Sequence, residues 1–268
     1  MLIARLITAA VLLAACIGAM FLLPPTWWSV LLLAILLAAG YEWSGLAGRG
    51  PGARWAYCIV LAATAMAILW VVESAADAAT GKRVEHTIYA AACVFWVLVA
   101  PVWLARGWRL KAALAAAAGW IVLVPAWLAL ARLQADPLQL LLVLGIVWLA
   151  DTAAYASGRA WGRHKLAPRV SPGKTWEGVA GAAAAVAVYY VTVSAFAPGQ
   201  PWASGRAGML VFAGVTVLSI VGDLFESLMK RQAGVKDSGS LLPGHGGVLD
   251  RIDGLLAALP FAALLLRQ

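Results

Sequence analysis

Long apolar runs, each of roughly 20 residues, follow one another along almost the entire chain, and short polar segments separate them. A run of this length crosses the apolar thickness of a bilayer as one helix. The runs are continuous and rich in Ala and Leu, whereas strands of a transmembrane β-barrel alternate apolar and polar residues. The pattern predicts an all-α, polytopic integral membrane protein with about nine transmembrane helices. Their expected positions are 2–23, 27–47, 55–75, 87–105, 110–132, 138–157, 176–196, 205–225 and 250–267.

Composition supports this interpretation. Of the 268 residues, 63% are hydrophobic and 12% are charged, whereas a soluble domain carries about 25% charged residues. Cys16, Cys58 and Cys93 lie singly in apolar runs without the spacing of a metal site, so we expect them to be buried apolar residues. The segment that ends at Cys16 resembles the cleavage box of a bacterial lipoprotein. Because eight further apolar runs follow it, we expect an uncleaved first helix.

The distribution of Lys and Arg predicts the orientation of the helices. With the N-terminus in the cytoplasm, 15 of the 20 Lys and Arg residues fall on the cytoplasmic side, which is the bias that the positive-inside rule describes. The other five are Lys82, Arg83, Arg132, Arg206 and Arg267. The net charge of +8 therefore needs no nucleic-acid partner. We expect a multi-pass protein of a bacterial inner membrane.

Polar residues are unevenly distributed along what we predict to be a single membrane domain, residues 1–268. Residues 1–135 are predicted to form a helical scaffold. Residues 136–268 are predicted to carry a cytoplasmic-side active site in two polar loops. A carboxylate inside a membrane costs about 2.5–3.5 kcal/mol, so a functional role is the first hypothesis for it. The embedded acids all fall toward the cytoplasmic side, and they are Glu42, Asp151, Asp223, Glu226, Asp250 and Asp253.

The first polar cluster begins within the sixth apolar run and continues beyond it. Asp151, Tyr155 and Arg159 are four residues apart, so a helix places them on one face. A basic loop follows, and a Pro-Gly turn with neighbouring hydroxyls is expected to open the seventh helix as an anion site. A basic loop that touches lipid headgroups would have a similar composition. The segment is not a Walker A loop, because Pro168 stands where that motif needs its first glycine. The predicted substrate-binding residues here are Arg163, Lys165, Ser171, Lys174 and Thr175.

The second polar cluster contains two pairs of carboxylates around a basic, glycine-rich loop. Asp223 and Glu226 are three residues apart, and so are Asp250 and Asp253. This arrangement suits a hard cation such as Mg²⁺ that bridges phosphate oxygens. The alternative is that the second pair only stabilises a helix N-terminus. His245, between glycines, could bind a phosphate, transfer a proton or orient the loop.

The segment Ser227–Asp253 resembles the signature of the phosphatidate cytidylyltransferase (CDP-diacylglycerol synthase) family. It matches the pattern S-x-x-K-R-x4-K-D-x-G-x2-L-P-x-H-G-G-x2-D-R-x-D at every fixed position. The upstream segment H-K-L-A-P-R-V-S-P-G-K-T-W-E-G resembles a second conserved block of the same family. The resemblance covers roughly the C-terminal half of the chain.

The resemblance implies an enzyme that makes CDP-diacylglycerol and pyrophosphate from CTP and phosphatidate with Mg²⁺, and it leaves open a monovalent cation beside the Mg²⁺. It implies a metal centre at Asp223, Asp250 and Asp253, a multi-span fold and a homodimer in membrane lipid. Gly246 and Gly247 are expected to bind substrate. The expected catalytic residues are Asp223, Lys230, Arg231, Lys236, Asp237, His245, Asp250, Arg251 and Asp253.

The residues favour a direct reaction. Much of the phosphate monoester is dianionic at pH 7, so its oxygen needs no strong base to become a nucleophile. Repulsion between this anion and a triphosphate opposes the reaction, and cationic groups reduce it. The sequence shows no evident Ser-His-Asp or Cys-His nucleophile. We therefore expect direct attack of phosphatidate on the α-phosphorus of CTP.

Two other functions are compatible with part of the sequence. Asp250–Gly254 reads D-R-I-D-G, as in CDP-alcohol phosphotransferases, but the apolar segment 255–268 lacks the second acidic pair of that family. An ion-coupled transporter could use Glu42, Asp151 and Asp223 as a cation path. Transporter sites tend to lie near the midplane of the membrane, whereas these acids are expected at one face.

Overall fold

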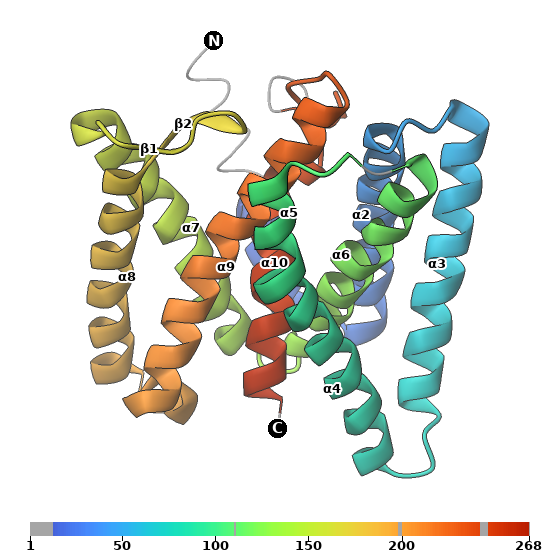
Figure 1. Cartoon of the computed structure of the whole chain (residues 1–268). Helices are drawn as coiled ribbons and strands as arrows, with labels where there is room; N and C mark the ends of the chain where they lie inside the picture. Colours follow the sequence, from blue (N-terminus) through green and yellow to red (C-terminus); the bar gives the residue numbers. More distant parts are fainter. Residues whose placement is uncertain (1–12, 110, 198–199, 242–245, 268) are drawn as a thin grey trace.

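The computed structural model describes residues 13–109, 111–197, 200–241 and 246–267. Within these ranges the chain is a bundle of long helices that run alternately up and down, with one small hairpin at the end of the bundle (Figure 1). The helices are α2 (Pro25–Leu46), α3 (Pro51–Glu73), α4 (Ala78–Val94), α5 (Ala100–Arg106), α6 (Ala112–Leu133), α7 (Pro137–Trp161), α8 (Trp176–Phe196), α9 (Gly205–Gln232) and α10 (Leu249–Leu266). A π-helical turn, η1 (Phe95–Val99), joins α4 to α5, and a 3-10 turn, η2 (Pro201–Ala203), precedes α9.

Seven of these helical segments are long and apolar enough to cross a membrane, which supports the expected polytopic all-α protein. They are α2, α3, the continuous segment Ala78–Arg106, α6, α7, α8 and α9. The expected helix at 250–267 is present as α10, whose 18 residues include three charged ones near its start, so it is not among the seven. Of the expected helix at 2–23, a short apolar helix at Leu13–Leu22 is described, and residues 1–12 lie outside the described ranges.

Residues at the helix ends explain where several helices begin. Proline occupies the first turn of α2, α3 and α7, where its missing N–H is not needed. The Asp136 carboxylate caps α7 by accepting a hydrogen bond from Gln139 N at 2.9 Å. The Thr175 hydroxyl caps α8 in the same way, with Gly178 N as donor at 3.1 Å. These caps satisfy backbone donors that a helix cannot pair within itself.

The segment before α8 differs from the sequence prediction. Instead of a loop with a Pro-Gly turn, strands β1 (Lys165–Ala167) and β2 (Ser171–Thr175) form an antiparallel hairpin. Lys165 pairs with Thr175, and Ala167 pairs with Ser171, so Pro172 and Gly173 lie inside a strand. The reverse turn falls at 168–170, where Val170 N donates to Ala167 O at 3.1 Å. Strand pairing, which holds β2 against the helix ends, therefore outweighs the local preference of the Pro-Gly pair for a turn.

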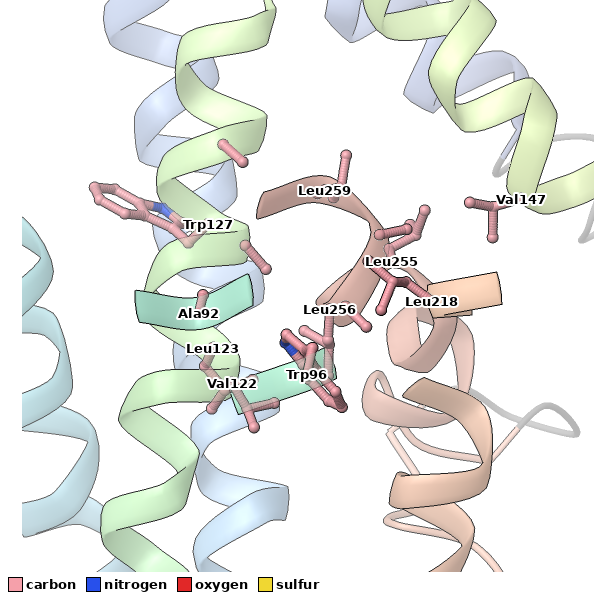
Figure 2. Packing of buried hydrophobic residues seen from close by; sticks show 14 of the residues in the cluster. Ala92, Trp96, Val122, Leu123, Trp127, Val147, Leu218, Leu255, Leu256 and Leu259 are labelled. Carbon is pink, nitrogen blue, oxygen red and sulfur yellow. The ribbon is translucent and has the colours of Figure 1, made fainter. Parts of the chain in front are cut away.

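Helix α10 is the centre of the bundle and packs against α2, α4, α6, α7 and α9. Figure 2 shows Leu255, Leu256 and Leu259 of α10 among buried side chains from the surrounding helices, Trp96 and Val147 among them. Each of these residues is less than one tenth exposed. Because α10 carries two of the predicted site carboxylates at its first turns, this packing also fixes the predicted site.

Helix α9 is held by both halves of the chain. The ring of Phe225 contacts Trp43 of α2, Phe95 and Trp96 of η1, and Trp103 of α5, with centroid distances of 5.1–6.3 Å. On another side, Gly222 lets α9 approach α10, because a Cβ there would collide with the Asp253 carbonyl oxygen. The predicted site residue Asp223 and the embedded acid Glu226 therefore lie on a tightly packed segment.

Candidate functional site

A cavity of about 440 Å³ opens where α7 and α9 end and α8 and α10 begin. The hairpin β1–β2 lies beside these helix ends in Figure 1. Polar residues from four elements, α7, β2, α9 and α10, line the cavity, together with an apolar wall that includes Leu166, Val179 and Ile220. The polar side chains in its lining are Asp151, Tyr155, Arg159, Ser171, Lys174, Thr175, Asp223, Asp250 and Asp253. Six of these were predicted as site residues from the sequence.

Asp223 and Lys174 form the ion pair at the centre of this lining. Lys174 Nζ lies 2.5 Å from Asp223 Oδ2, although the two residues come from different elements, β2 and α9. The Ser227 hydroxyl also donates to Asp223 Oδ1 at 3.4 Å. Asp253 lies near enough to Asp223 to interact with it electrostatically, and so does Asp151. The cavity therefore collects three carboxylates around one ammonium group.

Hydrogen-bond donors from neighbouring residues fix the Asp250 carboxylate. Its Oδ1 accepts from Lys230 Nζ at 2.6 Å. Its Oδ2 accepts from Ser238 N at 3.0 Å, from the Ser238 hydroxyl at 3.0 Å and from Gly247 N at 2.7 Å. Asp250 thus joins the start of α10 to both ends of the glycine-rich loop. Lys230 also forms an ion pair with the buried carboxylate of Glu226.

The other predicted basic and loop residues lie around the cavity rather than in its lining. Arg231 joins α9 to the hairpin region, because its side chain donates to Val170 O at 3.3 Å and to Val235 O at 3.4 Å. Gly246 adopts a positive φ of 83° beside the Asp250 carboxylate. Five predicted residues are exposed at this end of the bundle and contribute no lining, namely Arg163, Lys165, Lys236, Asp237 and Arg251. His245 lies outside the described residues.

The donor set suits a hard cation in its chemistry, since carboxylate oxygens are the ligands that Mg²⁺ prefers. Asp223, Asp250 and Asp253 all face the same cavity. In the described parts of the chain, however, no three acidic, His or Cys side chains converge into a ready group of metal ligands. Lys174 and Lys230 occupy the carboxylate oxygens of Asp223 and Asp250. A cation at this place would therefore compete with two ammonium groups.

Sequence reasoning missed three contributors to this region. Asp151 was recognised as an embedded acid on one helix face with Tyr155 and Arg159, but none of the three was predicted as a site residue. All three line the cavity, and the side chains of Tyr155 and Arg159 are 2.9 Å apart. Glu42 was recognised as an embedded acid, but its partner could not be known. Its carboxylate accepts hydrogen bonds from the backbone at the start of α10. The available signal was the cost of placing a carboxylate in an apolar run.

Comparison with known proteins identifies the family of this chain. Residues 3–268 match the model of the Cytidylyltransferase family. A phosphatidate cytidylyltransferase of Pseudomonas aeruginosa is 41% identical over 97% of this chain and 96% of its own length. A protein of the same name from Brucella suis is 40% identical over 87% of this chain and 80% of its own length. Another from Haemophilus influenzae is 51% identical over 46% of this chain and 43% of its own length. Nothing in these comparisons supports a transporter, and the chain belongs to the cytidylyltransferase family.

Proposed function

We propose that this protein transfers the cytidylyl group of CTP to phosphatidate and so makes CDP-diacylglycerol and pyrophosphate. Relatives that match nearly the whole chain carry the name phosphatidate cytidylyltransferase. The observation that carries the proposal is the cavity at the helix ends, where carboxylates and Lys174 meet beside an apolar wall. Such a cavity can hold a charged phosphate group next to lipid.

In the proposed reaction, a phosphate oxygen of phosphatidate attacks the α-phosphorus of CTP. The new P–O bond forms as the bond between the α-phosphorus and the bridging oxygen to the β-phosphate breaks, and pyrophosphate leaves with that oxygen. Lys174, which lines the cavity and pairs with Asp223, would neutralise phosphate charge. Transfers of this type depend mainly on positioning and charge stabilisation. Lys230 contributes through Asp250, which it holds in place at the start of α10.

We propose Asp223, Asp250 and Asp253 as the residues that hold Mg²⁺, with Asp151 close by. When bound, Mg²⁺ would neutralise phosphate oxygens that repel one another. The support is that all four carboxylates line one cavity. Mg²⁺ keeps several waters and needs few protein ligands, so the competition with Lys174 and Lys230 does not demand that every carboxylate change its partner.

A pyrophosphate assay tests the proposal directly. Purified protein in detergent is given CTP, phosphatidate or both, with and without Mg²⁺, next to the variants Asp223→Asn and Glu73→Gln. We expect release only with both substrates and Mg²⁺, and a loss in Asp223→Asn of more than about 100-fold, the upper range for an outer-shell partner. Glu73, 60% exposed and paired with Arg132 at the opposite end of the bundle, is the matched control. Release without phosphatidate would contradict the proposal.

We further propose nine transmembrane helices, with the N-terminus and the cavity facing the cytoplasm of a bacterial inner membrane. Fourteen of the Lys and Arg residues in the described ranges lie at the cavity end and five at the other, which follows the positive-inside rule. In intact cells, the cysteine of a Lys236→Cys variant should not react with a thiol reagent that cannot cross the membrane. Rapid labelling from outside would indicate the opposite orientation. The proposed homodimer depends on the family resemblance alone.

A further inference from the structure

Glu42 is a buried acid that the proposed reaction does not use. It lies near the end of α2, in the N-terminal half of the chain, and is 7% exposed. Its carboxylate reaches the glycine-rich loop and the start of α10, about 200 residues further along the sequence. A buried carboxylate is costly unless its oxygens find donors, so its contacts show what it does.

The donors around Glu42 belong to the loop and to the first residues of α10. Its Oε1 accepts from Val248 N at 3.0 Å, and its Oε2 accepts from Leu249 N at 2.9 Å. These N–H groups have no partner within a helix, and negative charge is favourable at this end of a helix. The Ser238 hydroxyl is also 2.9 Å from Oε2. Glu42 therefore caps α10 and binds the loop at the same time.

Ser238 connects Glu42 to the site. Its hydroxyl lies 2.9 Å from Glu42 Oε2 and 3.0 Å from Asp250 Oδ2, so the single proton is shared between the two carboxylates. Asp250 lines the cavity and is bonded to Lys230. Without the Glu42 carboxylate, the Ser238 hydroxyl would lose one of its two acceptors. Its hydrogen bond to the Asp250 carboxylate would then no longer be fixed from the other side.

Two glycines, Gly239 and Gly247, lie against the same carboxylate, and at Gly247 the Ser238 hydroxyl is closer still. A Cβ on Gly239 would lie 2.5 Å from Glu42 Oε1, and a Cβ on Gly247 would also collide with the Glu42 carboxylate. Real Cβ atoms do not approach other heavy atoms this closely. Gly239 and Gly247 thus both lie against the Glu42 side chain.

We propose that Glu42 is a positioning residue of the cytidylyl transfer, which rests on the function proposed above. It touches no reacting group in this arrangement. It fixes the loop at Ser238 and Gly247, and the start of α10 at Val248 and Leu249, and through Ser238 it orients Asp250 in the cavity. The first helices of the chain thereby contribute to the geometry of a site whose other residues come from the C-terminal half.

The test compares Glu42→Gln and Glu42→Ala with Glu85→Gln. Glu85 is the matched control, because it is 1% exposed and fully paired, with Arg132 and Arg267, but lies at the other end of the bundle. The measurements are kcat and KM for CTP at several Mg²⁺ concentrations, thermal stability in detergent, and hydrogen–deuterium exchange of peptides that cover 246–260.

We expect kcat to fall about 10- to 100-fold in Glu42→Ala, as for other outer-shell partners, with a smaller change in KM. The Gln variant should retain part of the activity, because its amide oxygen still accepts one or two of the three hydrogen bonds. Exchange at 248 and 249 should become faster in both Glu42 variants. Glu85→Gln should lower thermal stability but leave kcat and this exchange unchanged.

Three outcomes would overturn the inference. A folded Glu42→Ala variant with kcat within about two-fold of the wild type would show that the contact does not matter to the reaction. Unchanged exchange at 248 and 249 would show that Glu42 does not hold the start of α10. An equal loss of kcat in Glu85→Gln would reduce the effect to general stability. If the wild type itself releases no pyrophosphate, the proposed function fails, and with it any role of Glu42 in it, while exchange still decides whether Glu42 anchors the loop.

Discussion

Replacing Lys230 with methionine should destabilise the protein far more than removing one of its acidic partners. Lys230 forms ion pairs with Glu226, and with Asp250 at 2.6 Å. The three side chains are 12%, 2% and 6% exposed, respectively. Two carboxylates thus share one ammonium group in a place with little access to water. The ion pair with Lys230 is the only compensation for the Glu226 carboxylate that the described residues provide by direct contact.

The number of charges in this group gives the expected change in the free energy of unfolding. The wild-type group has two negative charges and one positive charge. Lys230→Met leaves two buried carboxylates without a counter-charge, and removal of one partner from a buried ion pair costs about 3–5 kcal/mol. Glu226→Gln instead leaves Lys230 and Asp250 as a neutral pair, and its cost should stay within about 1–3 kcal/mol. Methionine preserves most of the volume of lysine, so the difference reports charge rather than packing.

The free energy of unfolding can be measured by SDS titration in mixed micelles for the wild type, both single variants and the double variant Lys230→Met/Glu226→Gln. We expect the double variant to be more stable than Lys230→Met, because one uncompensated carboxylate has been removed. The sign of this coupling is the sharp part of the prediction. If Lys230→Met is as stable as Glu226→Gln, or if the second substitution adds its full cost, the shared-ammonium argument is refuted.

Two further predictions concern the hairpin. Lys174→Gln should lower kcat/KM for CTP about 10- to 100-fold, since a hydrogen bond to a charged group contributes about 1.5–3 kcal/mol. The control is Lys111→Gln, because Lys111 is exposed at the same end of the bundle but does not line the cavity, and this variant should change kcat/KM little. Equal losses in both would indicate only a general effect of surface charge. Thr175→Val should destabilise the protein by about 1 kcal/mol through loss of the α8 cap. Thr175→Ser, which keeps the hydroxyl, should recover most of the unfolding free energy, and failure to do so would remove the capping role.

The sequence predicted the helices well where apolar runs were long and bounded by polar residues. The run at 176–196 coincides with α8, and the run at 205–225 lies inside α9, which continues to Gln232 because its last turns bury Glu226 and Leu228 against the bundle. The hairpin at 165–175 was not predicted, since three- and five-residue strands carry too little periodicity to be recognised. Its pairing depends on the helix ends that it closes.

The site was predicted in its residue types more than in its contacts. Asp223, Asp250, Asp253 and Lys174 were expected and do line one cavity. Their partners were not predictable, because Lys174 reaches Asp223 from a hairpin whose position only the folded bundle defines. Thr175 was expected to bind substrate, but its hydroxyl also caps α8, and a local sequence pattern cannot separate these two uses.

Gly239 and Gly247 of the signature segment show how a distant residue can constrain a short sequence pattern. The backbone conformation does not demand glycine at 239 or 247, since neither has a positive φ. The Glu42 carboxylate fills the space that a side chain at 239 would need, and at 247 the Ser238 hydroxyl and the Glu42 carboxylate fill it together. The acid and the two glycines therefore form one structural unit, although α2 and the loop lie at opposite ends of the sequence. The embedded carboxylate of α2 needs the donors that the loop and the start of α10 supply, and the loop needs glycine where this carboxylate lies. Each feature of the sequence therefore explains the other once the chain is folded.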